Sequence, residues 1–515
     1  MEATTIEATE GGAGMGRHVG DVTFAAEDFT HFRSRLRQCL ETLPRVMGHG
    51  DFGVLPAMVG AELELSLVDA SGRPVPVSTA VRAALDDDRI ALEVARSNVE
   101  VNLTPVNLAG RPFTAPTGEA ESMPAHITAV SLPQYGARAV PIGTLPTLRA
   151  ADLTAGALTP QPRFHALEEA WARRRTAPFL VRVRDGTQGF VAAESVAVQG
   201  AACSWQVHLT VPPHRFCRTF NAAQVASGPA LAAAGNSPLP FGGRAWQEAR
   251  IPLYEHGFGD WQGTARQWAR LPRVGFGHAW LRGGPLTAFE DAVRNYDVLL
   301  PAPRSADSRP GEPYPALEEL RLHLSTLWPW NRPVYDPAGN LRIEFRALPS
   351  GPTPLDMAAN TAFLIGLTYW LAAEERDVAQ CLPFAHARAN FYRAARNGLD
   401  CALWWPPCPG EATTCEHQAA SLVRRLLPQA RAGLRLAGVA ADEADGFLHL
   451  LECRVASGRT GAWWQQRAHE SLGDRTGQAA GPRELGELPE RYARLAEHRA
   501  PVHTWNLPSD VRRRP

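Results

Sequence analysis

The sequence predicts an α+β fold, in which short strands and separate helices follow one another without a regular strand–helix alternation. Four short segments between residues 61 and 346 alternate apolar and polar residues, which is the period of a strand with one buried face. After about residue 355 the apolar residues instead recur every three or four positions, which is the period of a helix. A doubly wound α/β protein would interleave these two patterns along the whole chain.

The first elements can be justified in order from the N-terminus. Residues 1–20 are acidic and rich in glycine, and we expect them to be disordered. Residues 27–43 carry apolar side chains at helical spacing and predict a first helix. The four predicted strands follow, at residues 61–65, 99–103, 205–209 and 341–346.

The last third of the chain changes character. Residues 301–315 form a polar, proline-rich loop that is long enough to be a lid or an insertion. The helical pattern beyond this loop is clearest at residues 358–373 and 416–436. We therefore expect a main domain over residues 21–400 and a helical C-terminal region over residues 401–515.

The basic residues exclude several kinds of enzyme. The chain has 52 basic residues, and every one of them is arginine. Pyridoxal-phosphate enzymes, lysine aldolases, P-loop ATPases and protein kinases all need a lysine, so these classes are excluded. Codon usage is the simplest origin of the bias, because alanine, glycine and proline are also abundant. Any phosphate must therefore be held by arginine, by backbone N–H groups or by a metal.

Charge and hydropathy limit which partners and which cellular compartment we expect for the protein. The net charge of −1 gives no basic footprint for nucleic acid. No apolar run reaches the ~18 residues of a membrane helix, and the N-terminus lacks the basic and apolar regions of a signal peptide. We expect a cytoplasmic protein without nucleic-acid or membrane partners, and its oligomeric state is not readable from the sequence.

The eight cysteines do not form a recognisable metal or redox motif. None of them makes a Cys-x-x-Cys pair. Cys401, Cys408 and Cys415 lie close to His417, but their spacing does not fit the common zinc patterns. We expect free structural thiols.

The polar positions of the four strands carry an unusual set of side chains. Alternate residues of a strand point to the same face, so each strand buries its aliphatic residues and presents its polar ones. For any single strand, the solvated face of an antiparallel sheet is a sufficient explanation. A solvated face normally mixes many polar types, whereas this set consists of acids, amides, one imidazole and arginines: Glu62, Glu64, Glu100, Asn102, Gln206, His208, Arg342, Glu344 and Arg346.

If the four strands share one sheet, the carboxylates of Glu62, Glu64, Glu100 and Glu344 converge. Buried carboxylates that lie close together repel one another, and divalent cations between them relieve the repulsion. Oxygen ligands favour Mg²⁺, or Mn²⁺ in its place, over zinc, and Mg²⁺ commonly holds nucleotide phosphates. Glu93, seven residues before Glu100, is either a fifth ligand or a solvated charge.

The order and spacing of these segments resemble the glutamate–cysteine ligases, in the branch of the carboxylate–amine ligases found in plants and actinobacteria. The resemblance covers about residues 57–400, and each of its motifs is short. The motifs that carry it are Gly60-Ala61-Glu62-Leu63-Glu64, Glu93 and Glu100 before Thr104-Pro105, Pro162-Arg163-Phe164, the strand from Trp205 to Val211, Asn236-Ser237-Pro238 followed by Arg250, and Ile343-Glu344-Phe345-Arg346.

The resemblance implies a curled antiparallel sheet that forms a funnel with helices outside it, of the glutamine-synthetase-like type. It makes residues 21–400 the catalytic domain, with ATP and two or three Mg²⁺ ions in the funnel. The implied reaction joins the γ-carboxylate of glutamate to the amine of cysteine through an acyl phosphate, as a step of thiol biosynthesis.

The resemblance also implies a role for each candidate residue. Gln206 and His208 would complete the metal or phosphate shell, and Arg250 and Arg346 would bind the glutamate α-carboxylate or the transferred phosphoryl group. His208 can equally be a core histidine, and Arg250 a capping arginine. Asn236 predicts a turn before the following proline. The implied metal ligands are Glu62, Glu64, Glu93, Glu100 and Glu344.

Three alternatives remain open. The enzyme can use a different acceptor amine, because His208 stands where the plant branch has asparagine and Gln206 where other branches have histidine. The chain can also be a non-catalytic relative that binds a nucleotide or a metal. A glycosidase is disfavoured, because that chemistry uses two carboxylates rather than four or five.

Overall fold

The structure is a computed structural model of the whole chain, and it describes residues 24–175, 178–182, 190–258, 271–301, 313–406, 414–473 and 482–507. Three of our predictions fall outside these described residues. They concern residues 1–20, which we expect to be disordered, most of the proline-rich loop at 301–315, and Cys408. Within them, none of the helices combines the length and the apolar character that crossing a membrane requires. Cys401 is a buried free thiol, as expected.

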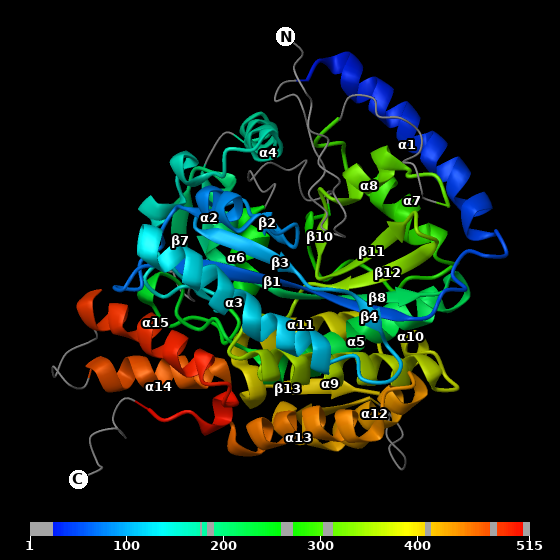
Figure 1. Ribbon diagram of the computed structural model, residues 1–515. Coiled ribbons are helices and arrows are strands. Elements are labelled where there is room, and N and C mark those ends of the chain that lie inside the picture. The colour runs from blue at the N-terminus through cyan, green and yellow to red at the C-terminus, as the bar shows by residue number, and fades with distance from the viewer. Residues whose placement is uncertain are drawn as a thin grey trace.

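An eight-stranded sheet forms the centre of the protein (Figure 1). Its main path runs in the order β11-β12-β8-β1-β3-β2, β4 and β5 also pair with β1, and every pairing is antiparallel. The strands are β1 (Met58–Val68), β2 (Ile90–Leu92), β3 (Asn98–Asn102), β4 (Val106–Asn107), β5 (Arg138–Val140), β8 (Trp205–Val211), β11 (Asn331–Asp336) and β12 (Asn340–Phe345). The α+β class and the curled antiparallel sheet are confirmed.

The four strands predicted from alternation are neighbours in this sheet. They become β12, β8, β1 and β3, in that spatial order. Glu64 lies opposite Glu100, and Glu344 lies opposite His208. Residues that face each other across antiparallel strands project to the same side, so the polar positions of all four strands share one face. The opposite face carries apolar residues such as Leu63, which is fully buried.

A layer of helices covers the apolar face and lies below the sheet in Figure 1. Its helices are α5 (Phe216–Ala234), α9 (Pro354–Ala373), α10 (Val378–Cys381), α11 (Phe384–Asn397), α12 (Ala419–Leu436) and α13 (Ala441–Ser457). Helix α9 is apolar on almost all sides, as expected of a helix buried between a sheet and other helices. Gly366 of α9 and Gly433 of α12 let the two helices touch, because a Cβ on Gly433 would lie 1.8 Å from the Gly366 carbonyl oxygen.

Other elements surround the polar face. Figure 1 shows α1, α4, α7 and α8 above the sheet. The helices are α1 (Ala26–Met47), α2 (Ser78–Leu85), α4 (Pro162–Ala172), α6 (Arg250–Gly257), α7 (Leu286–Asn295) and α8 (Glu318–Leu324). Helix α3 (Thr114–Tyr135) packs instead on α9 of the layer below. The short strand pairs are β6 (Phe179–Arg182) with β7 (Phe190–Ala193), and β9 (Val274–Gly275) with β10 (Trp328–Pro329). The expected helix at residues 27–43 is α1, and the Pro162-Arg163-Phe164 motif forms the first turn of α4.

The C-terminal region is helical after a hairpin that the sequence pattern does not reveal. The hairpin pairs β13 (Ala402–Trp405) with β14 (Cys415–Gln418). The helix expected from residue 416 therefore begins only at Ala419, and α14 (Gly461–Gly473) and α15 (Pro482–Glu497) follow α13. Helix α12 packs on α9, so both sides of the expected division at residue 400 contribute to one continuous core, and that division stays a prediction.

Candidate active site

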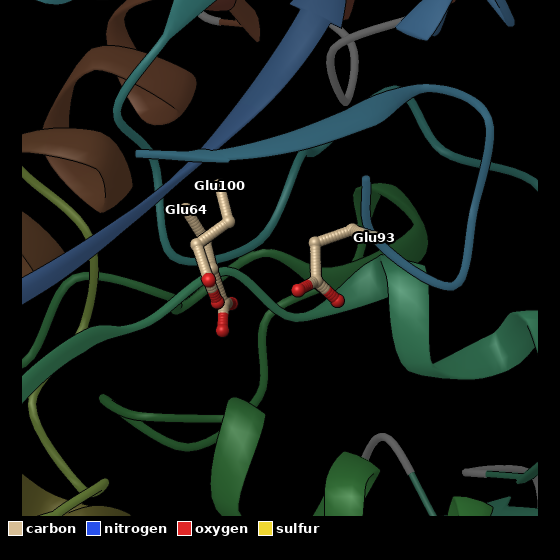
Figure 2. Close-up of side chains that lie close together, drawn as sticks. All are labelled: Glu64, Glu93 and Glu100. Carbon is tan, nitrogen blue, oxygen red and sulfur yellow. The ribbon is translucent and has the colours of Figure 1, made fainter. Parts of the chain in front are cut away.

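Three carboxylates converge at one side of the polar face. Glu64 projects from β1, Glu100 from the neighbouring β3, and Glu93 from the segment that follows β2. Figure 2 shows the three side chains turned toward the same small space. One carboxylate oxygen from each lies within 4.8 Å of those of the other two, and no second group of three acids, histidines or cysteines converges so closely in the described part of the chain. We call these three residues the acidic half of the site.

The acidic half carries more negative charge than its surroundings neutralise. Burial raises the pKa of Glu93 to about 7, and the negative charge of Glu64 adds to the effect. Burial and then the charge of Glu62 raise the pKa of Glu100 well above its usual range. Burial also raises the pKa of Glu64, although Ser204 donates hydrogen bonds to its carboxylate. A cluster of carboxylate oxygens with uncompensated charge fits a hard divalent cation.

Glu64 is held firmly in place. Its carboxylate accepts hydrogen bonds from the Ser204 backbone N–H at 2.6 Å, from the Ser204 hydroxyl at 2.7 Å and from the Gln206 side-chain amide at 2.7 Å. The amide oxygen of Gln206 accepts a hydrogen bond from Arg346. Gln206 therefore connects the acidic half to the arginines on the other side of the face.

Glu62 and His208 form a pair in the middle of the polar face. Their Oε1 and Nε2 atoms are 2.9 Å apart, and both side chains are buried. The other ring nitrogen of His208, Nδ1, has no hydrogen-bond partner among the residues that the structure describes. Glu344 lies directly opposite His208 on β12. Glu62, His208 and Glu344 thus line up across three adjacent strands.

The far side of the face is built around a neutralised acid. Arg332 donates to both oxygens of Glu344, from Nε at 3.0 Å and from Nη2 at 2.6 Å and 2.7 Å, and Arg346 donates from Nη1. Burial alone would raise the pKa of Glu344, but the two arginines outweigh it and set this pKa to about 2. We call Arg332, Glu344 and Arg346 the basic half of the site.

Two further residues border the site. The hydroxyl of Tyr254 accepts a hydrogen bond from Arg346 Nη2 at 3.4 Å. Arg163, in the first turn of α4, lies close enough to Glu93 and Glu100 to feel their charges, although burial lowers the pKa of its guanidinium. Arg163 therefore stands beside the acidic half rather than only at a helix start.

Arg250 has partners different from those that its motif implies. It is 2% exposed and donates to Glu248 at 3.2 Å, to the Ala347 carbonyl at 3.1 Å and to the Arg346 carbonyl at 3.2 Å. These partners belong to the scaffold behind the site. The geometry makes Arg250 a support of the strand end that carries Arg346, and its charge also acts on Glu64.

The sequence motifs do not include Arg332. It lies opposite Glu344 on β11, and β11 and β12 form a hairpin across residues 337–339. If the predicted strand at residues 341–346 is extended backward through this turn as a hairpin, Arg332 pairs with Glu344. The turn at residues 337–339 is therefore the sequence signal that could have revealed Arg332.

A curled antiparallel sheet with clustered acids and arginines on one face suits an enzyme that handles phosphate and carboxylate groups. The family that the chain matches supports an ATP-dependent carboxylate–amine ligase. Residues 58–481 match glutamate–cysteine ligase family 2 (GCS2), and the chain belongs to this family. No curated protein matches the chain by sequence.

A solved ligase structure shares the fold, and two further ligase structures align with lower scores. A glutamate–cysteine ligase from Francisella tularensis in complex with AMP aligns with a TM-score of 0.55 and 11% identity, over 90% of this chain and 92% of that one. A bifunctional glutathione synthetase from Pasteurella multocida aligns with a TM-score of 0.48 and 12% identity, over 91% of this chain and 55% of that one. The complex of the prokaryotic ubiquitin-like protein Pup with its ligase PafA aligns with a TM-score of 0.39 and 11% identity, over 85% of this chain and 72% of that one. At such identities, the first likeness shows the fold alone.

Proposed function

We propose that the protein is an ATP- and Mg²⁺-dependent ligase that joins the γ-carboxylate of glutamate to the amine of cysteine. The observation that carries the proposal is the arrangement of one sheet face, where the acidic half and the basic half lie on either side of Gln206. Membership of the glutamate–cysteine ligase family supports this choice of substrates. We place the reaction in the cytoplasm, in thiol biosynthesis.

The acid residues would hold the metal ions that ATP brings. Glu64, Glu93 and Glu100 offer one set of oxygen ligands, and Glu62, His208 and Glu344 offer a second set on adjacent strands. Mg²⁺, or Mn²⁺ in its place, would neutralise phosphate oxygens and polarise the γ-phosphoryl group. The Nδ1 of His208 has no hydrogen-bond partner in the described part of the chain, and the pKa values of Glu93 and Glu100 are raised, as expected of groups that lack their cation.

The arginines would position the reactants for phosphoryl transfer. A γ-carboxylate oxygen of glutamate attacks the γ-phosphorus of ATP, the bond to the β–γ bridging oxygen breaks, and ADP leaves. Arg346, oriented by Glu344 and Gln206, would bind the phosphoryl oxygens, because a guanidinium offers two parallel donors to an oxyanion. This contribution is one of charge and position, as expected for phosphoryl transfer.

The second step releases phosphate. The amine nitrogen attacks the acyl carbon, the bond from that carbon to the phosphate oxygen breaks, and the nitrogen loses a proton. Phosphate leaves and an amide remains. Cysteine as the source of the amine rests on the family, and a different acceptor amine is the alternative.

Phosphate release tests the proposal. The protein is incubated with ATP, Mg²⁺ and glutamate, and candidate amines are added one at a time. We expect release to require both glutamate and an amine, with cysteine giving the highest kcat/KM. Release that is fastest with another amine would reassign the acceptor, and release without any need for a carboxylate would contradict the ligase.

A further inference from the structure

A buried asparagine connects the C-terminal helices to the active site. Asn236 lies in the loop after α5 and is fully buried. Its side chain and its backbone make hydrogen bonds to four different segments of the chain. These bonds lead by two separate routes to the backbones of Glu64 and Arg346.

The first route leads to the acidic half. The side-chain N–H₂ of Asn236 donates to the Ser350 carbonyl at 2.7 Å. The Ser350 hydroxyl in turn donates to the Glu64 carbonyl at 2.7 Å. The main chain that carries Glu64 is therefore fixed relative to Asn236 by two short hydrogen bonds, of which the first is buried and the second is partly buried.

The second route leads to the basic half. The Asn236 backbone N–H donates to the Glu248 carboxylate at 2.9 Å, and this carboxylate also accepts from Arg250 at 3.2 Å. Arg250 donates to the Arg346 carbonyl at 3.2 Å. Glu248 is fully buried, and its charge is paired with Arg250. Asn236 thus sets the place of the strand end that carries Arg346.

Two residues of the C-terminal helices hold Asn236 itself. Tyr492 of α15 accepts from the Asn236 side chain at 2.7 Å and donates to the Pro141 carbonyl at 3.0 Å. Gln465 of α14 donates to the Asn236 backbone carbonyl at 2.9 Å and to its side-chain oxygen at 2.8 Å. Both Tyr492 and Gln465 are fully buried. Helices α14 and α15, which none of the motifs above includes, therefore anchor the point where the two routes meet.

We propose that Tyr492 and Gln465 are positioning residues of the active site. They hold Asn236 so that the backbones of Glu64 and Arg346 keep the separation that phosphoryl transfer needs. Neither residue touches substrate, and both act through Asn236. The proposal rests on the proposed function for its catalytic meaning, but the geometry that it claims can be measured without turnover.

The test compares two matched substitutions, Tyr492→Phe and Tyr335→Phe. Tyr335 is equally buried, and its hydroxyl also donates to a proline carbonyl, that of Pro315, at 2.7 Å. Each substitution removes one buried hydroxyl, so we expect similar losses of stability. Mn²⁺ affinity, measured by electron paramagnetic resonance, should fall at least fivefold in Tyr492→Phe and less than twofold in Tyr335→Phe.

Turnover gives a second readout. The kcat for phosphate release should fall at least fivefold in Tyr492→Phe with KM for ATP within twofold, because a displaced phosphoryl site harms the transition state more than binding. Gln465→Met, which keeps the volume and loses the donor, should behave in the same way. Equal effects of Tyr492→Phe and Tyr335→Phe on affinity and kcat would overturn the proposal.

Amide hydrogen exchange separates this proposal from the proposed function. Peptides that contain Arg346 and Ser350 should exchange their amide hydrogens faster in Tyr492→Phe than in the wild type. In Tyr335→Phe their exchange rates should equal those of the wild type. A wild-type protein that binds no Mn²⁺ and releases no phosphate would refute the ligase, and the exchange rates would still decide the positioning. Unchanged exchange at these peptides in Tyr492→Phe would refute the positioning alone.

Discussion

The acidic and the basic halves of the site use the same residue type in opposite ways. Glu344 is fully buried and Glu93 is half-buried, and burial by itself would raise the pKa of both carboxyl groups. The pKa of Glu93 reaches about 7 because its neighbours are acids, whereas that of Glu344 falls to about 2 because Arg332 and Arg346 bind it. The partner rather than the burial decides the charge. Two arginines already balance the charge of Glu344 in the basic half, whereas the acidic half needs a cation to reach the same balance.

Breaking the acidic half should have the largest effect on activity. Glu64→Gln removes one charged ligand from the convergent cluster and keeps the hydrogen-bonding shape. Losing one preorganised charge-stabilising group costs ~3–4 kcal/mol in the barrier, so kcat should fall about 10²–10³-fold. Steady-state phosphate release measures the change. Glu290→Gln, on α7 and outside the convergent group, is the control, and near-normal turnover of Glu64→Gln would remove Glu64 from the metal site.

Breaking the basic half should chiefly reduce stability. Arg332→Met leaves the buried Glu344 with Arg346 as its remaining arginine partner, and removing one partner of a buried ion pair costs about 3 kcal/mol or more. Urea unfolding at pH 7 measures the loss. Arg431→Met removes an exposed arginine from its pair with Asp445 and should cost less than ~1 kcal/mol. Equal losses in the two variants would show that the Glu344 pair is not the buried unit described here.

The stability of the protein should also depend on pH through His323, a histidine that belongs to neither half of the site. Burial lowers the pKa of His323, on α8, to about 4. Below pH 6.5 the unfolded chain binds a proton that the folded chain does not, so the free energy of unfolding falls as pH drops from about 6.5 to about 4. This loss amounts to roughly 2–3 kcal/mol.

Removing the histidine isolates that response. His323→Gln should show a smaller decrease in unfolding free energy between pH 7 and pH 4.5 than the wild type, measured by urea titration at each pH. Parallel decreases in the two proteins would mean that other groups carry the acid sensitivity.

The contact of Tyr254 with the basic half should matter least. The hydrogen bond from Arg346 is long, at 3.4 Å, and Glu344 and Gln206 already orient the same guanidinium. Tyr254→Phe should therefore lower kcat/KM only severalfold, about 1 kcal/mol. Steady-state kinetics checks this, and a loss above 100-fold would give the hydroxyl a direct part in the reaction.

Short-range patterns were enough to find most of the polar face. Strand alternation and motif order pointed to Glu64, Glu100 and Glu344, and the antiparallel sheet brings their strands together. Alternation cannot show what lies across a hairpin, so Arg332 was missed. Alternation also cannot decide whether Glu93 is a metal ligand or a solvated charge, because only the fold of the segment after β2 brings that side chain to the cluster.

Long-range contacts were beyond the sequence patterns. Asn236 predicts only a turn before Pro238, yet it bonds to Tyr492, which lies 256 residues further along the chain. The motif of Arg250 implies a substrate contact, whereas its buried guanidinium binds backbone carbonyls. In both cases the residue type suits either role, and these contacts appear only once the chain is packed in three dimensions. The substrate contact of Arg250 stays a prediction.

The affinity for Mn²⁺ tests the difference between the two halves most directly. It would be measured by electron paramagnetic resonance in the wild type, Glu100→Gln and Arg346→Met. We expect the wild type to bind Mn²⁺, Glu100→Gln to bind at least tenfold more weakly, and Arg346→Met to bind no more weakly than the wild type. Unchanged affinity in Glu100→Gln, or an equal loss in both variants, would contradict the assignment of the cation to the acidic half.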